Sequence, residues 1–283
     1  ADVPNPALGG KTPLEVAKHP NIDWIAREGL TGWARTIPAG FPPGSDVGCM
    51  SVFGYDPRKY HTGRAPLEAA AQGIFLASDQ VAFRCNTLTV ENGVMIDHSA
   101  DHITSEESRQ LIEMVNQQLG GNGIRFYSGV SYRHLAIVEC GMWNVECEEL
   151  AKTTCTPPHD ITGKPVAPYL PTGPGSELLR KLMCESAGVL KDHPVNARRI
   201  QQGKPPVTSV WFWGQGTAAK FPPFRQQYGL RGACISAVDI VRGLGRLVGF
   251  DIIQVPGITG YFDTNYKGKA DYALKALDDH DFV

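Results

Sequence analysis

The strongest structural signal in this chain is the Asn92-Gly93 pair, which lies between two apolar runs within VAFRCNTLTVENGVMI, residues 81–96. Asn-Gly between such runs is typical of a short hairpin turn, because both residues tolerate positive φ. We therefore expect two antiparallel strands joined around Glu91, Asn92 and Gly93. This hairpin predicts that the middle of the chain forms an antiparallel sheet.

The residues after the hairpin predict how that sheet is completed. Apolar residues recur at helical spacing from Ser105 onward, and Gly120 and Gly121 end the pattern. Two further strands are expected in IRFYSGV and YRHLAIVEC. The order strand, strand, helix, strand, strand indicates an α+β lobe.

The chain before this lobe predicts small elements, and the chain directly after it predicts loops around one helix. Two short helices, broken at His19 and Pro20, are expected to dock on a sheet, and a short strand is expected at 33–37. Residues 157–175 and 193–206 are rich in Pro, Gly and polar side chains, so we expect extended loops there. A helix is expected between them.

Alternating strands and helices return near the end of the chain. We expect strands at 208–213, 233–238 and 252–255 and helices at 240–248 and 269–277, with one more strand beginning at residue 281. Strand, helix and strand in series predict a parallel α/β sheet. The fold class is therefore α/β, divided at 1–75, 76–207 and 208–283, with the α+β lobe in the middle.

Length and charge exclude several classes of protein. A chain of 283 residues is expected to form one large α/β domain or two linked lobes. Its net charge of -2 gives no reason to expect a nucleic acid or an anionic membrane as partner, and no run approaches the ~18 apolar residues that span a bilayer. We expect a cytoplasmic protein. Its seven cysteines include no CxxC pair, which favours reduced, mostly buried thiols.

The stretch GFPPGSDVGCMSVFGYDP, residues 40–57, places Ser45 between a Pro/Gly turn and an apolar run that can start a helix. Unpaired N–H groups at a helix start favour phosphate or a developing oxyanion, so Ser45 fits a nucleophile or a phosphate site. Most serines at this position cap the helix instead. Local chemistry leaves both interpretations open.

Charged side chains interrupt two of the expected apolar strands. Arg84 lies in one, and Arg133 with His134 lies in another. A buried arginine requires an anionic partner, either a carboxylate inside the fold or a carboxylate or phosphate on a ligand. His159 and Asp160 lie in the first loop, where they form either an oriented acid/base pair or local hydrogen bonds.

One further stretch resembles a metal site. Its residues are Asp97, His98, Ser99, Ala100, Asp101 and His102, and their side chains include types that bind Zn or Mn. Two Asp-His pairs between a strand and a helix are more typical of solvated capping groups. Both interpretations predict a structured turn here.

At PPGSDVGCMSVFGYDPRKYHTGRAPLEA the chain resembles the archaeal-type, cofactor-independent phosphoglycerate mutases of the alkaline phosphatase superfamily. Further matches follow in family order along essentially the whole chain: KTPLEVAKHPNID, VAFRCN, YRHL, PPHDI, HPVN, WFWGQG, RGACISAVDIVRGLG, VPGITGYFDTNYKGKA and DFV. Together these motifs are highly specific for that family.

The resemblance implies a discontinuous alkaline-phosphatase-like core with an inserted α+β lobe. It also implies two divalent metal ions, Mn or Mg, no 2,3-bisphosphoglycerate, and a small phosphorylated carboxylate as substrate. Ser45 matches the nucleophile and metal ligand that passes phosphate from the 3-position to the 2-position. By motif, Arg84, Arg133, Arg198, Asp263 and Lys269 bind the substrate, and His159 acts as acid/base.

The chain also departs from the family pattern. Family members begin with a strand that ends in an Asp-Gly pair, whereas this chain begins just after that point. After DFV the family continues with histidine and aspartate motifs that carry nearly all remaining metal ligands. We therefore expect a fragment of a longer polypeptide, with the ligands other than Ser45 outside it.

Two other functions stay open at this point. TGRAPLEA is similar to bacterial relatives proposed to act on homoserine or another small phosphoryl acceptor. A metal-poor protein that keeps only the anion-binding arginines would bind without catalysis.

Overall fold

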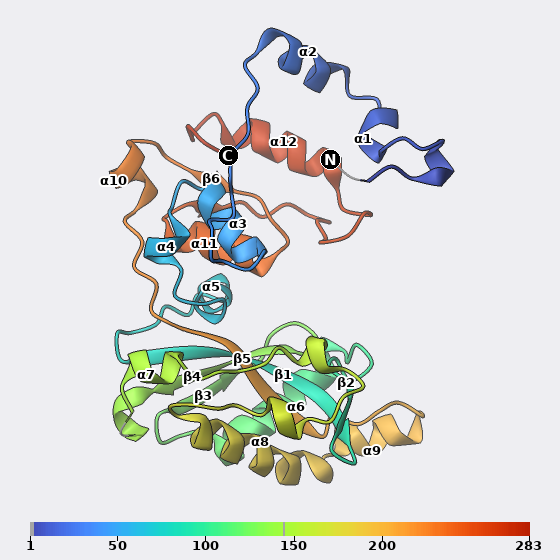
Figure 1. Ribbon diagram of the computed structural model, residues 1–283, viewed down its shortest axis with the longest axis vertical. Coiled ribbons are helices and arrows are strands. Elements are labelled where there is room, and N and C mark those ends of the chain that lie inside the picture. Colours follow the sequence, from blue (N-terminus) through green and yellow to red (C-terminus); the bar gives the residue numbers. More distant parts are fainter. Residues whose placement is uncertain (1–2, 144) are drawn as a thin grey trace. The chain divides into compact units, whose positions relative to one another are not determined.

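The computed structural model describes residues 3–143 and 145–283, and the chain divides into two compact units at Thr36 and Ile37 (Figure 1). The first unit contains three short helices, η1 (Pro6–Leu8), α1 (Pro13–Val16) and α2 (Pro20–Glu28). The two predicted helices are confirmed, and their docking on a sheet stays a prediction. The strand predicted at 33–37 is wrong, because residues 30–36 have no regular structure and Trp33 is fully exposed.

The second unit contains a five-stranded sheet in which every pairing is antiparallel. Its strands are β1 (Gln80–Glu91), β2 (Val94–Asp97), β3 (Ile124–Tyr127), β4 (Arg133–Glu139) and β5 (Ser209–Thr217). β1 pairs with β2, β4 and β5, and β3 pairs with β4. The predicted hairpin is confirmed, since Asn92 and Gly93 have φ of 49° and 74° between β1 and β2. The predicted α+β lobe is confirmed with it.

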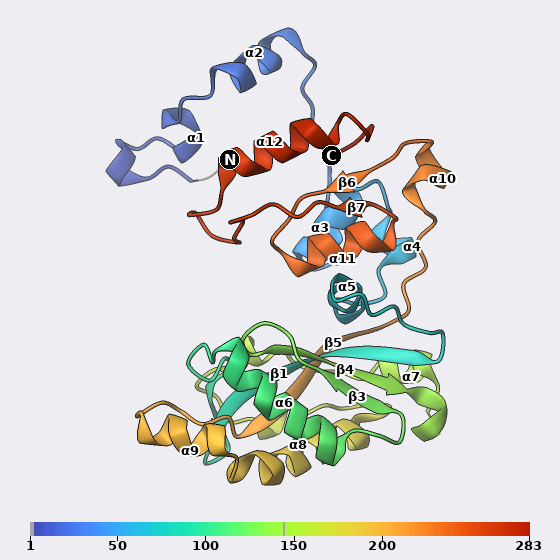
Figure 2. The same cartoon turned by 180° about the vertical axis from the view of Figure 1, so that it is seen from behind.

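Helices cover both faces of this sheet, as Figures 1 and 2 show. α6 (Ser105–Leu119) and α8 (Ser176–Lys191) lie on one face, and α5 (Ala65–Ala71) lies on the other. Side chains alternate along a strand, so Phe83 enters the large core with α6 and α8, while Ala82 packs against α5. Arg84 therefore shares the face that α5 covers. This alternation explains why a charged residue interrupts an apolar strand.

β5 corrects one prediction. The strand expected at 208–213 forms, but it pairs antiparallel with β1, with Trp213 opposite Arg84, and is not part of a parallel sheet. Local alternation identifies a strand without identifying its partner, which is why the sequence placed it with the strands that follow. The division of the chain at 1–75, 76–207 and 208–283 stays a prediction, with β5 in the sheet of the middle segment.

The remaining elements of the second unit build a smaller core. They are α3 (Ser45–Val52), α4 (Pro57–Tyr60), α10 (Phe224–Tyr228), β6 (Ala233–Cys234), α11 (Asp239–Leu247), β7 (Asp251–Ile252) and α12 (Tyr266–Ala276). β6 and β7 are parallel, as predicted, and Phe282 forms a parallel bridge to Gly232 where the last strand was expected. Met50, Leu67 and Phe250 are among the buried side chains that join these elements.

The second predicted loop, at 193–206, is partly wrong. Residues Pro194–Gln201 form helix α9, in which Pro194 is the first residue and the His193 ring accepts a hydrogen bond from the Val195 N–H. A proline and a capping side chain can start a helix in a polar segment. The first loop contains two short 3-10 helices, η3 (Pro158–Ile161) and η4 (Ala167–Tyr169).

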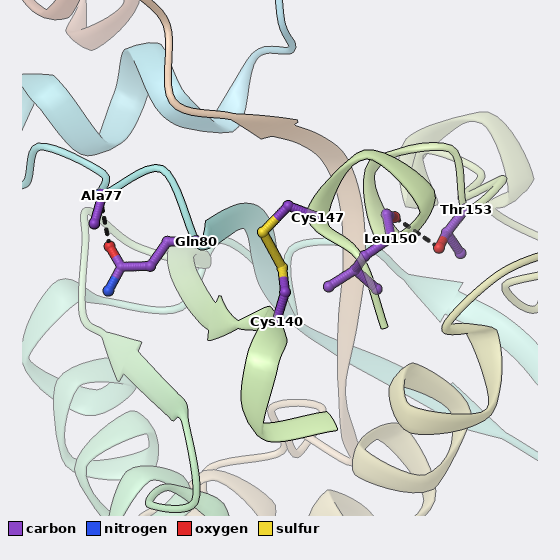
Figure 3. Close-up of a disulfide and its surroundings, with 6 residues drawn as sticks. All are labelled: Ala77, Gln80, Cys140, Cys147, Leu150 and Thr153. Carbon is purple, nitrogen blue, oxygen red and sulfur yellow. Dashed lines mark hydrogen bonds between the residues drawn. A yellow bond between two sulfur atoms is a disulfide. The ribbon is translucent and has the colours of Figure 1, made fainter. Parts of the chain in front are cut away.

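A disulfide joins Cys140 and Cys147, whose Cα atoms lie 5.4 Å apart (Figure 3). Cys140 begins the 3-10 helix η2 (Cys140–Trp143), and Cys147 begins α7 (Cys147–Ala151). The expectation of reduced thiols is wrong for this pair, because two helical turns bring together cysteines that no short motif links. The other five cysteines are free.

Candidate functional site

Ser45 is the first residue of α3, and Gly44 occupies the capping position before it. The helix start was predicted, but the interpretation of Ser45 as the cap is wrong. A side chain on Gly44 would overlap the Asp46 carboxylate, which folds back over the helix start. Ser45 itself is exposed, whereas Val47 and Met50 anchor the helix in the core.

The residue after Ser45 is held by a histidine. Asp46 Oδ2 lies 2.9 Å from Nε2 of His61 in a half-buried ion pair. This hydrogen bond is the largest cause that lowers the pKa of the Asp46 carboxyl, and the charge of Arg64 lowers it further. Asp46 is therefore ionised at neutral pH, and Arg64 lies within electrostatic reach of the start of α3.

Arg84 is buried on β1 and has a carboxylate partner inside the fold. Its Nε lies 2.8 Å from Oε2 of Glu68 on α5, and its guanidinium lies 4.0 Å from the centre of the Trp213 ring. Burial lowers the pKa of Arg84 to about 10, the charge of Glu68 opposes this shift, and the charges of Arg64 and Arg133 add to it. Three arginines therefore share one locality with a single glutamate.

A cavity of about 700 Å³ opens beside these charges. Arg64, Glu68 and Arg133 line one side of it, and Asp239 of α11 and Tyr261 line the other. Glu68 Oε1 accepts a hydrogen bond of 3.0 Å from Arg64 Nε, and the guanidinium of Arg133 lies above the ring of Tyr132. The cavity thus lies between the antiparallel sheet and the smaller core.

His159 packs against the Trp213 ring, which also contacts Arg64 and Arg84. The two rings meet edge to face, with centres 5.2 Å apart, and His159 also meets His98 at 6.1 Å. The His159–Asp160 contact is 3.7 Å between exposed side chains, longer than a hydrogen bond. His159 is therefore positioned by aromatic rings more than by Asp160.

The turn at 97–102 supports the capping interpretation. Asp97 accepts hydrogen bonds of 2.7 Å from the backbone N–H groups of Ser99 and Asp101. Ala100, Asp101 and His102 all have positive φ, between 47° and 54°, which is rare for residues with side chains. Because Asp97 stabilises the turn, its oxygens are already engaged by the backbone.

Three other predicted residues lie apart from the arginines. Arg198 is on the exposed face of α9, while its neighbour Arg199 is buried and pairs with Glu107 at 3.0 Å. Asp263 accepts a hydrogen bond from Thr259, in the loop whose Gly260 and Tyr261 line the cavity. Lys269 is half-buried on α12.

The sequence reasoning missed Arg64, Glu68 and Trp213. A signal for the first two was present, because they stand four residues apart at the start of an expected helix in TGRAPLEA, a spacing that pairs opposite charges. Trp213 carried no comparable signal, since its role depends on the pairing of β5 with β1.

The described residues do not by themselves provide a two-metal site. Among residues 3–143 and 145–283 there is no group of three or more His, Cys, Asp or Glu side chains that could hold a metal ion. Ser45 offers a single hydroxyl oxygen, and Asp46 beside it is engaged by His61. No step is therefore derived through a metal ion.

Comparison with known proteins places this site in a family. The family profile described as 2,3-bisphosphoglycerate-independent phosphoglycerate mutase matches residues 26–196. A protein of that name from Methanosarcina barkeri is 53% identical over all of this chain and 69% of its own length. The chain belongs to this family. Another mutase of the family, from Methanosarcina acetivorans, is 52% identical over all of this chain and 70% of its own length.

Solved structures agree with the assignment to the mutase family. A protein from Pyrococcus horikoshii has a TM-score of 0.77 and 31% identity, over all of this chain and 66% of that protein. The cofactor-independent phosphoglycerate mutase from Thermoplasma acidophilum has a TM-score of 0.61 and 27% identity, over all of this chain and 73% of that protein. The chain thus spans about two thirds of the Pyrococcus protein.

The predicted resemblance and function are confirmed for the family, which interconverts 3-phosphoglycerate and 2-phosphoglycerate, a step of glycolysis, without 2,3-bisphosphoglycerate. The relatives' names do not favour the homoserine phosphotransferase or the metal-poor binding protein. The mixed α/β fold is confirmed as well. Among the described residues, no helix is both long and apolar enough to cross a bilayer.

Proposed function

We propose that Ser45 is the phosphoryl acceptor of the mutase reaction and that Arg84 and Arg133 hold the substrate. The observation that supports this most is the position of Arg64. It acts on Asp46, directly after Ser45, and it shares Glu68 with Arg84. The arginines of the sheet therefore lie close to Arg64, whose charge also lowers the pKa of the Asp46 carboxyl beside Ser45.

In the proposed reaction the Ser45 hydroxyl oxygen forms a bond to phosphorus while the bond between phosphorus and the substrate's O3 breaks. The serine proton leaves and O3 gains a proton, so the glycerate stays in the site as an alcohol. The 2-hydroxyl then attacks phosphoserine, loses its proton and regenerates Ser45. His159 is proposed to move one of these protons, because an imidazole can donate and accept a proton and its ring lies against Trp213, which contacts Arg84.

The arginines supply the binding chemistry for such a substrate. A guanidinium binds carboxylate or phosphate through two parallel hydrogen bonds, which fixes direction as well as distance. Arg198, Asp263 and Lys269 remain proposed substrate-binding residues on the strength of their motifs. Their positions add no contact to Arg84 or Arg133 among the described residues.

The finer parts of the family pattern belong to the same proposal. They are an alkaline-phosphatase-like core, two Mn or Mg ions and a cytoplasmic location. When bound, the ions would lower the pKa of the serine hydroxyl and neutralise phosphoryl charge. Ser45 would be one ligand, and the others are expected outside these 283 residues.

The test is an enolase-coupled assay of the complete polypeptide that contains this chain, with 3-phosphoglycerate and Mn. Turnover is expected, together with phosphoserine at Ser45 detected by mass spectrometry. Ser45→Ala should abolish both, because the acceptor oxygen is lost. The matched control Ser51→Ala, in the same helix, should keep both.

Two results would contradict the proposal. Turnover by Ser45→Ala at the wild-type rate would remove Ser45 from the reaction. Phosphate found on a residue other than Ser45 would identify a different acceptor.

A further inference from the structure

Glu68 contacts two arginines, in each case at the Nε atom of the arginine. Its Oε1 lies 3.0 Å from Nε of Arg64, and its Oε2 lies 2.8 Å from Nε of Arg84. The carboxylate is 13% exposed and Arg84 only 6%, so solvent screens their contact weakly. Arg64 Nε donates a hydrogen bond to Glu68, whereas Arg84 Nε is buried without a hydrogen-bond partner, so the contact with Arg84 is an ion pair only. Among the described residues, the terminal nitrogens of Arg64 and Arg84 form no hydrogen bond.

The charges around Glu68 do not balance. Arg64, Arg84 and Arg133 carry three positive charges, and Glu68 carries one negative charge. Within residues 3–143 and 145–283, no second carboxylate forms an ion pair with any of these arginines. Arg84 is the buried member and is paired with Glu68, whereas Arg133 is exposed and Arg64 is 36% exposed. Arg64, Arg133 and Arg242 outnumber Glu68 and Asp239 in the cavity lining, so the excess positive charge favours an added anion.

The backbone holds Arg64 firmly in place. Gly63, just before it, has φ of 142°, and a side chain there would overlap the Gln215 carbonyl of β5. The Thr62 hydroxyl donates a 2.8 Å hydrogen bond to the Thr217 carbonyl. The segment that leads into Arg64 is therefore attached to the sheet that carries Arg84.

We propose that Arg64 is a further substrate-binding residue and that Glu68 is a positioning residue for Arg64 and Arg84. By accepting a hydrogen bond from Arg64 Nε and pairing with Arg84, Glu68 leaves the Nη donors of both arginines for a small dianionic ligand with a carboxylate and a phosphate. Arg64 lines the cavity together with Arg133, so it binds an anionic group of the ligand there. This role rests on the proposed function.

The first experiment measures binding of 3-phosphoglycerate to the complete polypeptide that contains this chain, by calorimetry. Arg64→Lys keeps the charge but loses the planar fork, so affinity should fall about tenfold or more. The matched control is Arg109→Lys, which changes an exposed arginine paired with Glu106. That control should bind as the wild type does.

Glu68→Gln separates positioning from simple charge attraction. The substitution raises the positive charge of the site by one, so attraction alone predicts tighter binding. Positioning predicts the opposite, a loss of about tenfold, because neither Nε is held by a carboxylate. Glu106→Gln is the matched control, and thermal unfolding of each variant checks that a loss of binding is not a loss of fold.

The outcomes separate this inference from the proposed function. If the wild type binds 3-phosphoglycerate and both Arg64→Lys and Glu68→Gln bind it equally well or more tightly, Arg64 and Glu68 lack these roles while the function stands. If the folded, complete wild-type polypeptide binds neither 3-phosphoglycerate nor 2-phosphoglycerate, the proposed substrate site fails and these roles fail with it.

Discussion

The antiparallel lobe and the last segment of the chain both contain a β-sheet, but the two sheets differ in size and in strand direction. β1 is twelve residues long and pairs with three other strands, whereas β6 and β7 have two residues each. The lobe buries the rings of Phe83, Trp211 and Phe212, while Tyr261 and Phe262 in the last segment are 75% and 89% exposed. A long strand with three partners brings together more backbone hydrogen bonds and buried side chains than a pair of two-residue strands. We therefore expect the lobe to hold most of the stability.

The largest expected effect comes from deleting a ring in the lobe. Phe83→Ala removes a fully buried side chain that packs against Phe212, and should lower the free energy of unfolding by about 3–5 kcal/mol. Phe262→Ala, at an exposed position, should change it by less than about 0.5 kcal/mol. Urea unfolding followed by tryptophan fluorescence measures both. Equal losses would contradict the comparison.

A smaller effect is expected where the two regions meet. Gly243 of α11 packs against α5, and a side chain there would overlap the Leu67 carbonyl. Gly243→Ala should therefore destabilise the protein by about 1–3 kcal/mol. The control is Gly188→Ala in α8, where nothing obstructs a side chain and where stability should rise by roughly 0.5–1 kcal/mol. Thermal unfolding compares the two, and a stabilising Gly243→Ala would refute the close packing.

The third effect concerns pH. Burial lowers the pKa of His134 in β4 to about 3, and its Nδ1 accepts a hydrogen bond from the Gly129 N–H, so the ring is neutral in the fold. The unfolded chain binds a proton below about pH 6.5, so acidification favours unfolding by about 1.4 kcal/mol per pH unit from this residue. His134→Gln should flatten the decline of stability between pH 6.5 and pH 5. An unchanged slope would show that His134 is not buried neutral.

A histidine in the last segment has the opposite effect on the pH dependence of stability. Hydrogen bonding to Asp251, at 2.8 Å, raises the pKa of His280. Its contribution is present below pH 6.5 and is lost as pH rises through the raised pKa. His280→Gln should therefore matter less at pH 8 than at pH 6, in contrast to His134→Gln.

The local sequence pattern was sufficient to predict most helices and strands, but it did not predict which elements pack or pair with one another. The helix expected between the two loops forms at Ser176–Lys191, directly after Gly175. β5 was identified as a strand and assigned to the wrong sheet, since alternation does not reveal which strand lies alongside. The expected strand at 33–37 had the right composition but no partner, and no strand forms.

The site shows the same division between local and tertiary information. An arginine inside an apolar strand was enough to select Arg84, but its counter-charge Glu68 could be found only after α5 was placed on the sheet. Arg198 was chosen by motif, whereas the buried neighbour is Arg199, because helix phase decides which side chain turns inward. The sequence predicted which types of residue the site contains, but it did not predict which residues face one another.

The ends of the lobe have a consequence for its evolutionary history and its engineering. Val81, where the chain enters the sheet, is the register partner of Thr217, where the chain leaves it. A segment whose two ends meet adds little loop-closure entropy to a host chain. Residues 81–217 therefore have the geometry of a transferable module, which can be grafted, excised with a short linker or circularly permuted without separating the two sides of the host.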